Sequence, residues 1–331
     1  MKLAVLGAGA WGTALAISLT QKHAVTLWGR DTDDIERLLV TRSNTRYLPH
    51  ITLPDSLTIE TDLAVALANA ELSVIATSTA GLGATTALIH ERMPGMPILW
   101  ACKGFDKDTG KLPHELVGQL MGTKPGIHYG ALSGPSFALE VARGLPCALT
   151  LAANDLGFAR EMTAQLNGPA LRIYSSDDLV GVELGGALKN VMAIAAGICD
   201  GMQLGMNARA ALITRGLAEI VRLGVAMGGK PETFMGLAGL GDLVLTATGD
   251  LSRNRSVGIR LAQGENLHAI LAALGHVAEG VNSAQTALAL ARRHRVDMPI
   301  TEAVNAVLFA QAEPRETVKQ LLSRDTKPES A

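Results

Sequence analysis

The chain has 331 residues, of which 48% are hydrophobic and 18% charged, and its formal net charge is −2. This composition excludes a disordered chain and a general attraction to nucleic acid or to anionic membranes, and the length favours two domains over one. Aromatic residues make up only 3%, so the core must be built from small and aliphatic side chains.

Compartment and metal content can be judged from a few simple patterns. The three cysteines, Cys102, Cys147 and Cys199, lie far apart without metal-ligand spacing, which predicts reduced thiols in a cytoplasmic protein. The opening KLAVLG is typical of a strand and not of a secretion signal. The charge-free run Leu72–Ile89 is interrupted by glycines and rich in Thr and Ser, so we expect no membrane span. The eight histidines show no paired spacing, so we predict no metal site.

The first half of the chain alternates short apolar strands with helical patterns. The predicted helices include Thr13–Gln21, Thr32–Val40 and Ala159–Leu166. The predicted strands are Lys2–Leu6, Ala24–Trp28, Leu72–Ala76, Ile98–Ala101, His128–Ser133, Ala148–Ala152 and Leu171–Ile173. Such alternation is typical of a parallel, doubly wound sheet with helices on both faces.

The second half changes character after about residue 180, where helical patterns follow one another without a convincing strand. They are Val180–Leu204, Ala208–Ala226, Arg255–Ala262, Leu267–Leu274, Ser283–His294, Thr301–Leu308 and Pro314–Arg324. We therefore predict an α/β domain over residues 1–180 and an all-α C-terminal domain over residues 181–331, with the long helix through Lys189 at their junction.

The segment KLAVLGAGAWGTALA contains Gly7, Gly9 and Gly12 as an intact G-x-G-x-x-G between a strand and a helix. In this context Gly7 permits a tight turn, Gly9 lets the backbone approach a pyrophosphate, and Gly12 lets helix and strand pack closely. The helix N-terminus then offers free N–H groups to the phosphates. The motif predicts a Rossmann-type dinucleotide-binding domain, and glycines that serve only a turn are the alternative.

The second strand is followed by Arg30 and Asp31 in LWGRD. An arginine at this point can accept a ribose 2′-phosphate, whereas an acid would hold the free ribose hydroxyls. Arg30 therefore favours NADP(H), and Asp31 leaves NAD(H) open. Alternatively, Arg30 is a solvated surface charge.

Lys189 is the one charged residue in LGGALKNVMAIAAGIC. Gly185, Gly186, Ala193 and Ala196 lie on or beside its helix face, so we expect small neighbours that leave room for a ligand. No acid lies three or four residues away, and burial should lower the pKa of this lysine. A lysine with a pKa near neutrality can exchange a proton with a substrate, and a side chain that reaches the solvent at a domain edge is the alternative.

Two further segments carry polar residues in glycine-rich settings. Lys103 follows one predicted strand, and the turn with Gly134 and Ser136 follows another, at the sheet edge where ligands bind in such folds. Either could be ordinary loop chemistry. Asp242 follows a glycine cluster, and SRNR, from Ser252 to Arg255, stands at a predicted helix start. Guanidinium, amide, hydroxyl and helix N-terminus together predict a phosphate site, and a solvated helix cap is the alternative.

The sequence resembles, nearly end to end, the bacterial NAD(P)-dependent sn-glycerol-3-phosphate dehydrogenases. The motifs that carry the resemblance, in the family's order, are GAGAWGTALA, NTRYLP, ACKGF, LSGPSFALEVA, ALKNVMAIAAGICDG, NARAALITRGLAE, GLAGLGDL, LSRNRSVG and AEGV. The resemblance implies reversible hydride transfer between dihydroxyacetone phosphate and sn-glycerol 3-phosphate, which supplies phospholipid synthesis. This sequence departs from the family pattern at Ala10, where many members have Ser, and at Ser283, where Thr is common.

The resemblance also implies the roles of individual residues, with Lys189 as the catalytic acid and base. Around the substrate it implies Lys103, Gly134, Ser136, Asp242, Ser252, Arg253 and Asn254. Around the cofactor it implies Gly7, Gly9, Ala10, Trp11, Gly12, Arg30, Lys103, Ala138, Arg253, Val277 and Glu279. Asp242 could orient Lys189 or hold a substrate hydroxyl. Homodimers are common among similar proteins, but the sequence leaves the oligomeric state open.

Two rival functions fit parts of the same pattern. One is another two-domain dehydrogenase that acts on a β-hydroxy acid or on ketopantoate; the SRN cluster argues for phosphate, although arginine binds carboxylate as well. The other is a non-catalytic nicotinamide-binding sensor, which would not need Lys189, Asp242 and the SRN cluster together.

Overall fold

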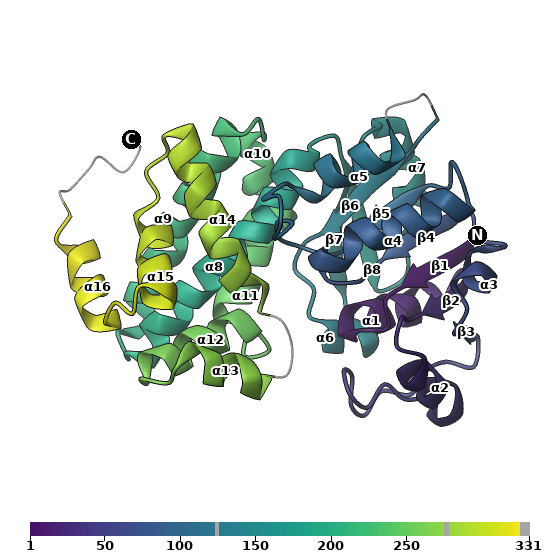
Figure 1. The fold of residues 1–331 in the computed structure, drawn as a ribbon, viewed down its shortest axis with the longest axis horizontal. Coiled ribbons are helices and arrows are strands. Elements are labelled where there is room, and N and C mark those ends of the chain that lie inside the picture. The colour runs from purple at the N-terminus through teal and green to yellow at the C-terminus, as the bar shows by residue number, and fades with distance from the viewer. Residues whose placement is uncertain (123–125, 275–277, 325–331) are drawn as a thin grey trace.

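The computed structural model describes residues 1–122, 126–274 and 278–324. An eight-stranded sheet forms its first half, and helices form its second half (Figure 1). The strands are β1 (Lys2–Leu6), β2 (Ala24–Trp28), β3 (Leu57–Glu60), β4 (Leu72–Ile75), β5 (Ile98–Trp100), β6 (Tyr129–Ser133), β7 (Cys147–Ala153) and β8 (Leu171–Ser176). The bounds predicted for β1 and β2 are confirmed, whereas β3 was not predicted.

The strand order is β3-β2-β1-β4-β5-β6-β7-β8, so the chain reverses direction across the sheet between β1 and β4. The sheet is parallel except that β6 and β7 pair antiparallel, which corrects the all-parallel prediction. The connection between β6 and β7 contains only α6 (Ala138–Ala142). A five-residue helix covers about 7.5 Å, too little to carry the chain back across the sheet. The chain therefore stays at the carboxyl edge, and β7 runs back from there.

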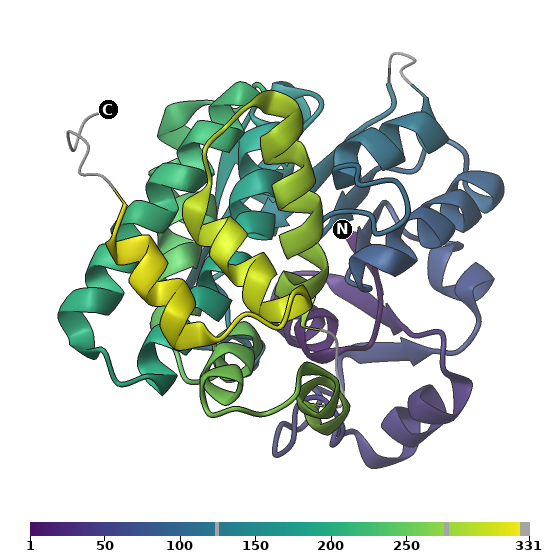
Figure 2. The ribbon, with the colours of Figure 1, turned by 60° about the vertical axis from the view of Figure 1, so that its left-hand side comes forward.

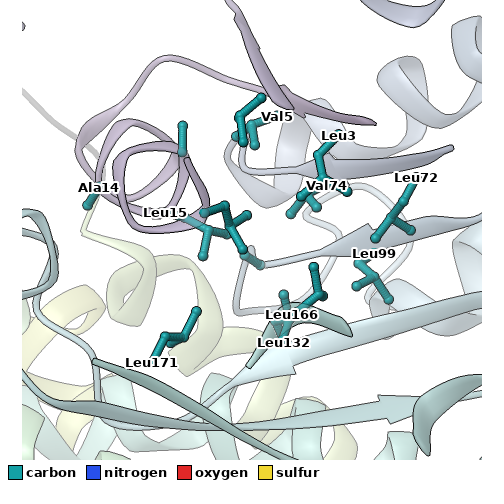
Figure 3. Close-up of a cluster of buried hydrophobic side chains, with 14 of the residues drawn as sticks. Leu3, Val5, Ala14, Leu15, Leu72, Val74, Leu99, Leu132, Leu166 and Leu171 are labelled. Carbon is teal, nitrogen blue, oxygen red and sulfur yellow. The ribbon is translucent and has the colours of Figure 1, made fainter. Parts of the chain in front are cut away.

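Helices cover both faces of the sheet because neighbouring residues of each strand point to opposite sides. Leu3 and Val5 belong to the apolar cluster beneath α1 (Ala10–Leu19), α2 (Thr32–Thr41), α6 and α7 (Leu156–Leu166) (Figure 3). Ala4 and Leu6 belong to the cluster on the other face, with α3 (Leu63–Leu67), α4 (Thr79–Arg92) and α5 (Pro113–Met121). The doubly wound sheet predicted from the sequence is therefore present.

The second half is helical throughout the part that the structure describes. Its helices are α8 (Leu179–Gly201), α9 (Gly205–Ala226), α10 (Pro231–Phe234), a π-helical turn η1 (Leu237–Gly241), α11 (Asp242–Thr248), α12 (Arg253–Ala262), α13 (Leu267–Leu274), α14 (Glu279–His294), α15 (Pro299–Phe309) and α16 (Pro314–Leu322). Figure 2 shows α15 and α16, in yellow, on the outside of this domain. The sequence had not predicted α10, η1 or α11.

Helix α8 is the centre of the helical domain, and its residues from Gly181 to Cys199 are all buried. Small residues let neighbours approach closely: a Cβ on Gly197 would lie 2.0 Å from the Arg255 carbonyl oxygen, and one on Gly258 2.0 Å from that of Ile194. Among the described residues α8 alone has the length and hydropathy of a membrane span, but 89% of its apolar window is buried inside the protein. This burial is typical of a core helix.

Candidate active site

Lys189 lies on α8 with its side chain only 9% exposed. Its ammonium group donates hydrogen bonds to Oδ1 of Asp242 and, over 3.0 Å, to Oγ1 of Thr246. Burial lowers the pKa of Lys189 to about 7, although the carboxylate of Asp242 opposes that shift. The lysine can therefore gain or lose a proton near neutral pH, and it does not extend to the solvent at a domain edge.

Asp242 is the first residue of α11 and directly follows the π-helical turn η1. Short π-helical segments are frequent at functional sites. Its carboxylate is 1% exposed, and Oδ2 accepts a hydrogen bond of 2.6 Å from Lys103 Nζ. Burial alone would raise the pKa of Asp242, but the ammonium groups of Lys103 and Lys189 lower it below its usual value. Because each oxygen holds one lysine, the geometry favours the orienting role for Asp242 over a direct contact with a substrate hydroxyl.

The small residues beside Lys189 do not leave the open space that the sequence suggested. A Cβ on Gly185 would lie 2.5 Å from the carbonyl oxygen of Ala238 in η1. A Cβ on Gly186 would lie 2.9 Å from Ser133 Oγ and 3.4 Å from the Lys103 side chain. The expectation of room for a ligand at these two positions was therefore wrong, because other parts of the chain fill it. The glycines let the Asp242 segment and Lys103 approach α8.

The carboxyl ends of β5 and β6 bring Lys103, Gly134 and Ser136 to the same place. Lys103 Nζ donates to the Gly134 carbonyl oxygen over 2.9 Å, and Ser136 Oγ donates to the same oxygen over 3.0 Å. Gly134 has φ = +139°, a left-handed conformation that favours glycine. This turn fixes Lys103 against Asp242, so two of the predicted substrate segments meet at Lys189.

The predicted phosphate cluster forms the start of α12. Ser252 is the N-cap and accepts a hydrogen bond from the Arg255 N–H, while Arg253 is the first helical residue and is exposed. The buried side chain of Asn254 donates to Asn190 Oδ1 on α8 and accepts from the Gly280 N–H on α14, both over 3.0 Å. Asn254 therefore ties three helices together, and Arg253 places an exposed guanidinium at a helix N-terminus.

The glycine loop has the geometry that its motif predicts. Gly7 has φ = +123°, and a Cβ on it would lie 2.7 Å from the Ala76 backbone. A Cβ on Gly12 would lie 1.9 Å from the Gly7 carbonyl oxygen, so only glycine fits there. A Cβ on Gly9 would meet no atom within 4 Å, and Gly9 is the N-cap of α1, followed by Ala10 and Trp11. The residues present therefore fit a pyrophosphate at the start of α1.

The end of β2 separates the roles of Arg30 and Asp31. The Asp31 side chain caps α2 by accepting a hydrogen bond of 3.1 Å from the Asp34 N–H. Arg30 is exposed and makes no hydrogen bond or ion pair with the described residues. The acid is thus occupied in the helix cap and the guanidinium is available, which fits a 2′-phosphate.

Two other predicted cofactor residues, Ala138 and Glu279, are the first residues of helices. Ala138 begins α6, which packs against α1, and Glu279 begins α14. Glu279 Oε2 lies 3.6 Å from the position of a Cβ on Gly104, beside Lys103. Burial raises the pKa of Glu279, although Arg253 opposes that shift. Val277 lies outside the described residues. Within those residues, no group of three His, Cys, Asp or Glu side chains could hold a metal ion.

Thr246 and Asn190 were missed as members of the site. Thr246 lies one turn after Asp242, and its Oγ1 donates to the Asp242 carbonyl oxygen over 2.7 Å while it accepts from Lys189. The i,i+4 spacing from Asp242 could have identified Thr246 once α11 was known to be helical. Asn190 directly follows Lys189 in the chain. This position places Asn190 near the site, but it does not predict the hydrogen bond between Asn190 and Asn254.

The dinucleotide loop, the buried lysine at the domain junction and the helical second domain define an NAD(P)-dependent oxidoreductase of the two-domain Rossmann class. Residues 2–159 match the model for the N-terminus of NAD-dependent glycerol-3-phosphate dehydrogenase, and residues 178–319 match that for its C-terminus. The chain belongs to this family, as its motifs indicated.

Individual relatives agree over the full length of the chain. The glycerol-3-phosphate dehydrogenase [NAD(P)+] of Aromatoleum aromaticum is 56% identical over 99% of this chain and 100% of its own, and that of Thiobacillus denitrificans is 57% identical with the same coverage. The crystal structure of the Coxiella burnetii glycerol-3-phosphate dehydrogenase superposes with a TM-score of 0.92 at 40% identity, covering 98% of this chain and 99% of its own. Membership of an enzyme family decides against the sensor and against the other dehydrogenases considered from the sequence.

Proposed function

We propose that this chain catalyses the reversible reduction of dihydroxyacetone phosphate to sn-glycerol 3-phosphate with NAD(P)H, and that Lys189 exchanges the proton. The observation that carries the proposal is the buried ammonium of Lys189, held by Asp242 and with its pKa lowered to about 7. Such a group can protonate an oxygen at neutral pH and take the proton back in the reverse reaction. The names of the relatives support the substrate pair and the use of either cofactor.

When bound, NAD(P)H would supply the hydride that the carbonyl carbon gains. As negative charge builds on the ketone oxygen, Lys189 Nζ donates one proton to it, so that the ketone gains a hydride and a proton and becomes the alcohol. Asp242 holds Nζ in place, and Thr246 fixes its second hydrogen bond. In the oxidation direction, neutral Lys189 accepts the hydroxyl proton.

The start of α12 is suited to the phosphate of the substrate. Arg253 provides the guanidinium, and the first-turn N–H groups add the positive end of the helix dipole. Asn254 positions this turn through Asn190 and Gly280, while Lys103 adds a second cation near the reacting oxygen. Binding energy from the phosphate would then position the carbonyl next to Lys189.

The test is NADPH oxidation by the purified protein with dihydroxyacetone phosphate and, in parallel, unphosphorylated dihydroxyacetone. We expect fast turnover on the phosphate ester alone. Lys189→Ala should lower kcat by about 10²- to 10⁴-fold while the Kd for NADPH stays the same. Turnover preserved in Lys189→Ala would refute the role of the lysine, and equal rates on both ketones would refute the phosphate site.

We also propose a cytoplasmic homodimer that supplies glycerol phosphate for phospholipid synthesis. The three free cysteines support a reducing compartment. Size-exclusion chromatography with light scattering would give the mass of the assembly. A monomer at all protein concentrations would refute the dimer.

A further inference from the structure

Glu183 is a buried carboxylate on α8 that has no part in the chemistry proposed for Lys189. Its Oε1 accepts hydrogen bonds of 3.0 Å from Trp100 Nε1, at the end of β5, and from the His114 N–H in α5. Its Oε2 lies 2.5 Å from His114 Nδ1. The side chain of Glu183 is 3% exposed and that of His114 is 22% exposed. One imidazole therefore connects this buried carboxylate with the protein surface.

A small cavity of about 10 Å³ lies against Glu183 and is also lined by Lys103 and Ser133. This volume is at the lower limit for one water molecule, and a buried water needs two to four polar partners. Ser133 Oγ is buried and has no hydrogen-bond partner among the described residues. Glu183, Ser133 and Lys103 lie among apolar lining residues such as Leu132 and Val182, so the cavity has three polar side chains that can hold a water.

The polar contacts of Lys189 lead toward the same cavity. Its ammonium bonds to one oxygen of Asp242, and the other oxygen accepts from Lys103, which lines the cavity. Lys189 has little exposed surface in the free protein, and a ketone and a nicotinamide stacked over it would cover what is left. Each ketone reduced removes one proton from Lys189, so this proton must be replaced before the next turnover.

We propose that a water molecule in this cavity completes a proton route from His114 through Glu183 and Lys103 to Lys189. The inference rests on the proposed function, because it serves the proton exchange of that reaction. For each ketone reduced, His114 takes one proton from solvent and passes one to Glu183. Lys103 gives one proton to Oδ2 of Asp242 and takes one from Glu183 through the water, and the protonated carboxyl group of Asp242 turns and gives its proton to Lys189. Every group between solvent and Lys189 returns to its starting state, and alcohol oxidation runs the route backwards.

The electrostatics around Glu183 are consistent with this route. Burial raises the pKa of Glu183, and it would lower the pKa of His114, but the adjoining carboxylate raises the pKa of His114 above its usual value. Cys102, after β5, and Tyr129, on β6, are two further titratable groups that are influenced by the charge of Glu183. Burial and the negative charge of Glu183 raise the pKa of both, so they stay neutral and do not compete for the proton.

The first test is Glu183→Gln, which keeps an acceptor for Trp100 and for the His114 N–H but cannot carry a proton. With dihydroxyacetone phosphate and NADPH, we expect kcat to fall about tenfold with unchanged KM values. The D₂O effect on kcat should rise, and the effect of deuterated NADPH should fall toward one, because proton supply becomes slower than hydride transfer. His114→Ala should show the same pattern, with kcat restored by added imidazole.

Glu219→Gln is the matched control, because Glu219 is also a buried carboxylate that accepts hydrogen bonds from backbone N–H groups, those of Ile300 and Thr301. It should leave both isotope effects unchanged. A lower kcat with unchanged isotope effects in Glu183→Gln would indicate a structural role and overturn the proposal. If Glu183→Gln does not fold, the His114→Ala variant decides instead. A kcat of His114→Ala that added imidazole does not restore would overturn the proton route.

A crystal structure of the wild-type protein at high resolution separates this inference from the proposed function. We expect one ordered water within hydrogen-bond distance of the Glu183 carboxylate and of Lys103 Nζ, the two groups that it must join, and of Ser133 Oγ. A dry cavity would overturn the proton route even if the reduction of dihydroxyacetone phosphate is confirmed. An inactive wild type that contains this water would instead refute the proposed reaction.

Discussion

The glycine loop and the lysine site recognise ligands by different physical means. The glycine loop uses backbone N–H groups and empty space, and its parts lie within Gly7–Gly12. The lysine site uses charge. Lys189 and Lys103 lie 53 and 139 positions before Asp242 in the chain, and each donates to one oxygen of its carboxylate. The first therefore depends on the space at each glycine, whereas the second depends on the balance of two ammonium groups and one carboxylate.

The strongest test of the charge balance is Asp242→Asn. The pKa of Lys189, lowered to about 7 by burial, should fall further without the carboxylate that opposes the shift. Ketone reduction needs protonated Lys189, so its rate is lost as the pH rises through that pKa. We expect kcat to fall about 10²- to 10³-fold at neutral pH and the alkaline limb of kcat/KM to move to lower pH.

The measurement is the pH profile of kcat/KM for dihydroxyacetone phosphate between about pH 5 and 9. Asp178→Asn is the control, because Asp178 is buried and accepts from the Gly181 and Lys230 N–H groups but forms no ion pair with a described residue. It should lower the melting temperature and leave the pH profile in place. An unmoved limb in Asp242→Asn would show that Asp242 does not set the charge of Lys189.

The glycine loop can be broken in two distinct ways. In Gly12→Ala the new methyl would lie 1.9 Å from the Gly7 carbonyl oxygen, so the loop must distort and the melting temperature should fall. In Gly9→Ala the methyl meets no atom of the chain within 4 Å and occupies the space expected for the pyrophosphate. We expect its melting temperature to stay near wild type while the Kd for NADPH rises about 10- to 100-fold, or about 1.4 to 2.8 kcal/mol.

Calorimetry and NADPH titration of both variants would check this difference. The two variants serve as controls for each other, because they add the same methyl three residues apart. A Gly9→Ala protein that binds NADPH normally would place the pyrophosphate elsewhere.

The sequence was sufficient for the parts of the molecule that local patterns determine. The strands β1 and β2, the glycine loop and the long buried α8 follow from residues next to one another in the chain. The antiparallel β7 was not predictable from its own residues, because its direction depends on the short α6 that precedes it.

The sequence predicted which residues form the lysine site but not how they are arranged. Lys103, Lys189 and Asp242 were recognised separately, but the sharing of one carboxylate by two lysines depends on how η1 and the β5 loop pack against Gly185 and Gly186. Small residues in a sequence do not reveal whether a ligand or another backbone fills the space beside them. This is why the expectation of open space at Lys189 was wrong although the lowered pKa was predicted.

Arg30→Ala tests whether the glycine-loop side of the molecule also uses charge. Because Asp31 is engaged in the cap of α2, Arg30 is the side chain free to meet a 2′-phosphate. We expect the KM for NADPH to rise about tenfold and the KM for NADH to change little. Arg172→Ala is the control, since Arg172 is exposed on β8 at the opposite end of the sheet. An equal loss for both cofactors would refute selection by Arg30.

The smallest expected effect is that of Thr246→Val, which removes one hydrogen-bond acceptor of Lys189 and leaves Asp242 in place. A buried ammonium that loses a neutral acceptor is destabilised by about 0.5–1.5 kcal/mol, so kcat should fall about two- to tenfold. Thr248→Val is a matched control: both hydroxyls donate over 2.7 Å to the carbonyl oxygen four residues earlier, but Thr248 is exposed. Steady-state rates for both variants distinguish the loss at Lys189 from any effect of the substitution on α11. A similar fall of kcat in both variants would mean that the hydroxyl of Thr246 stabilises helix α11 and does not act through its contact with Lys189.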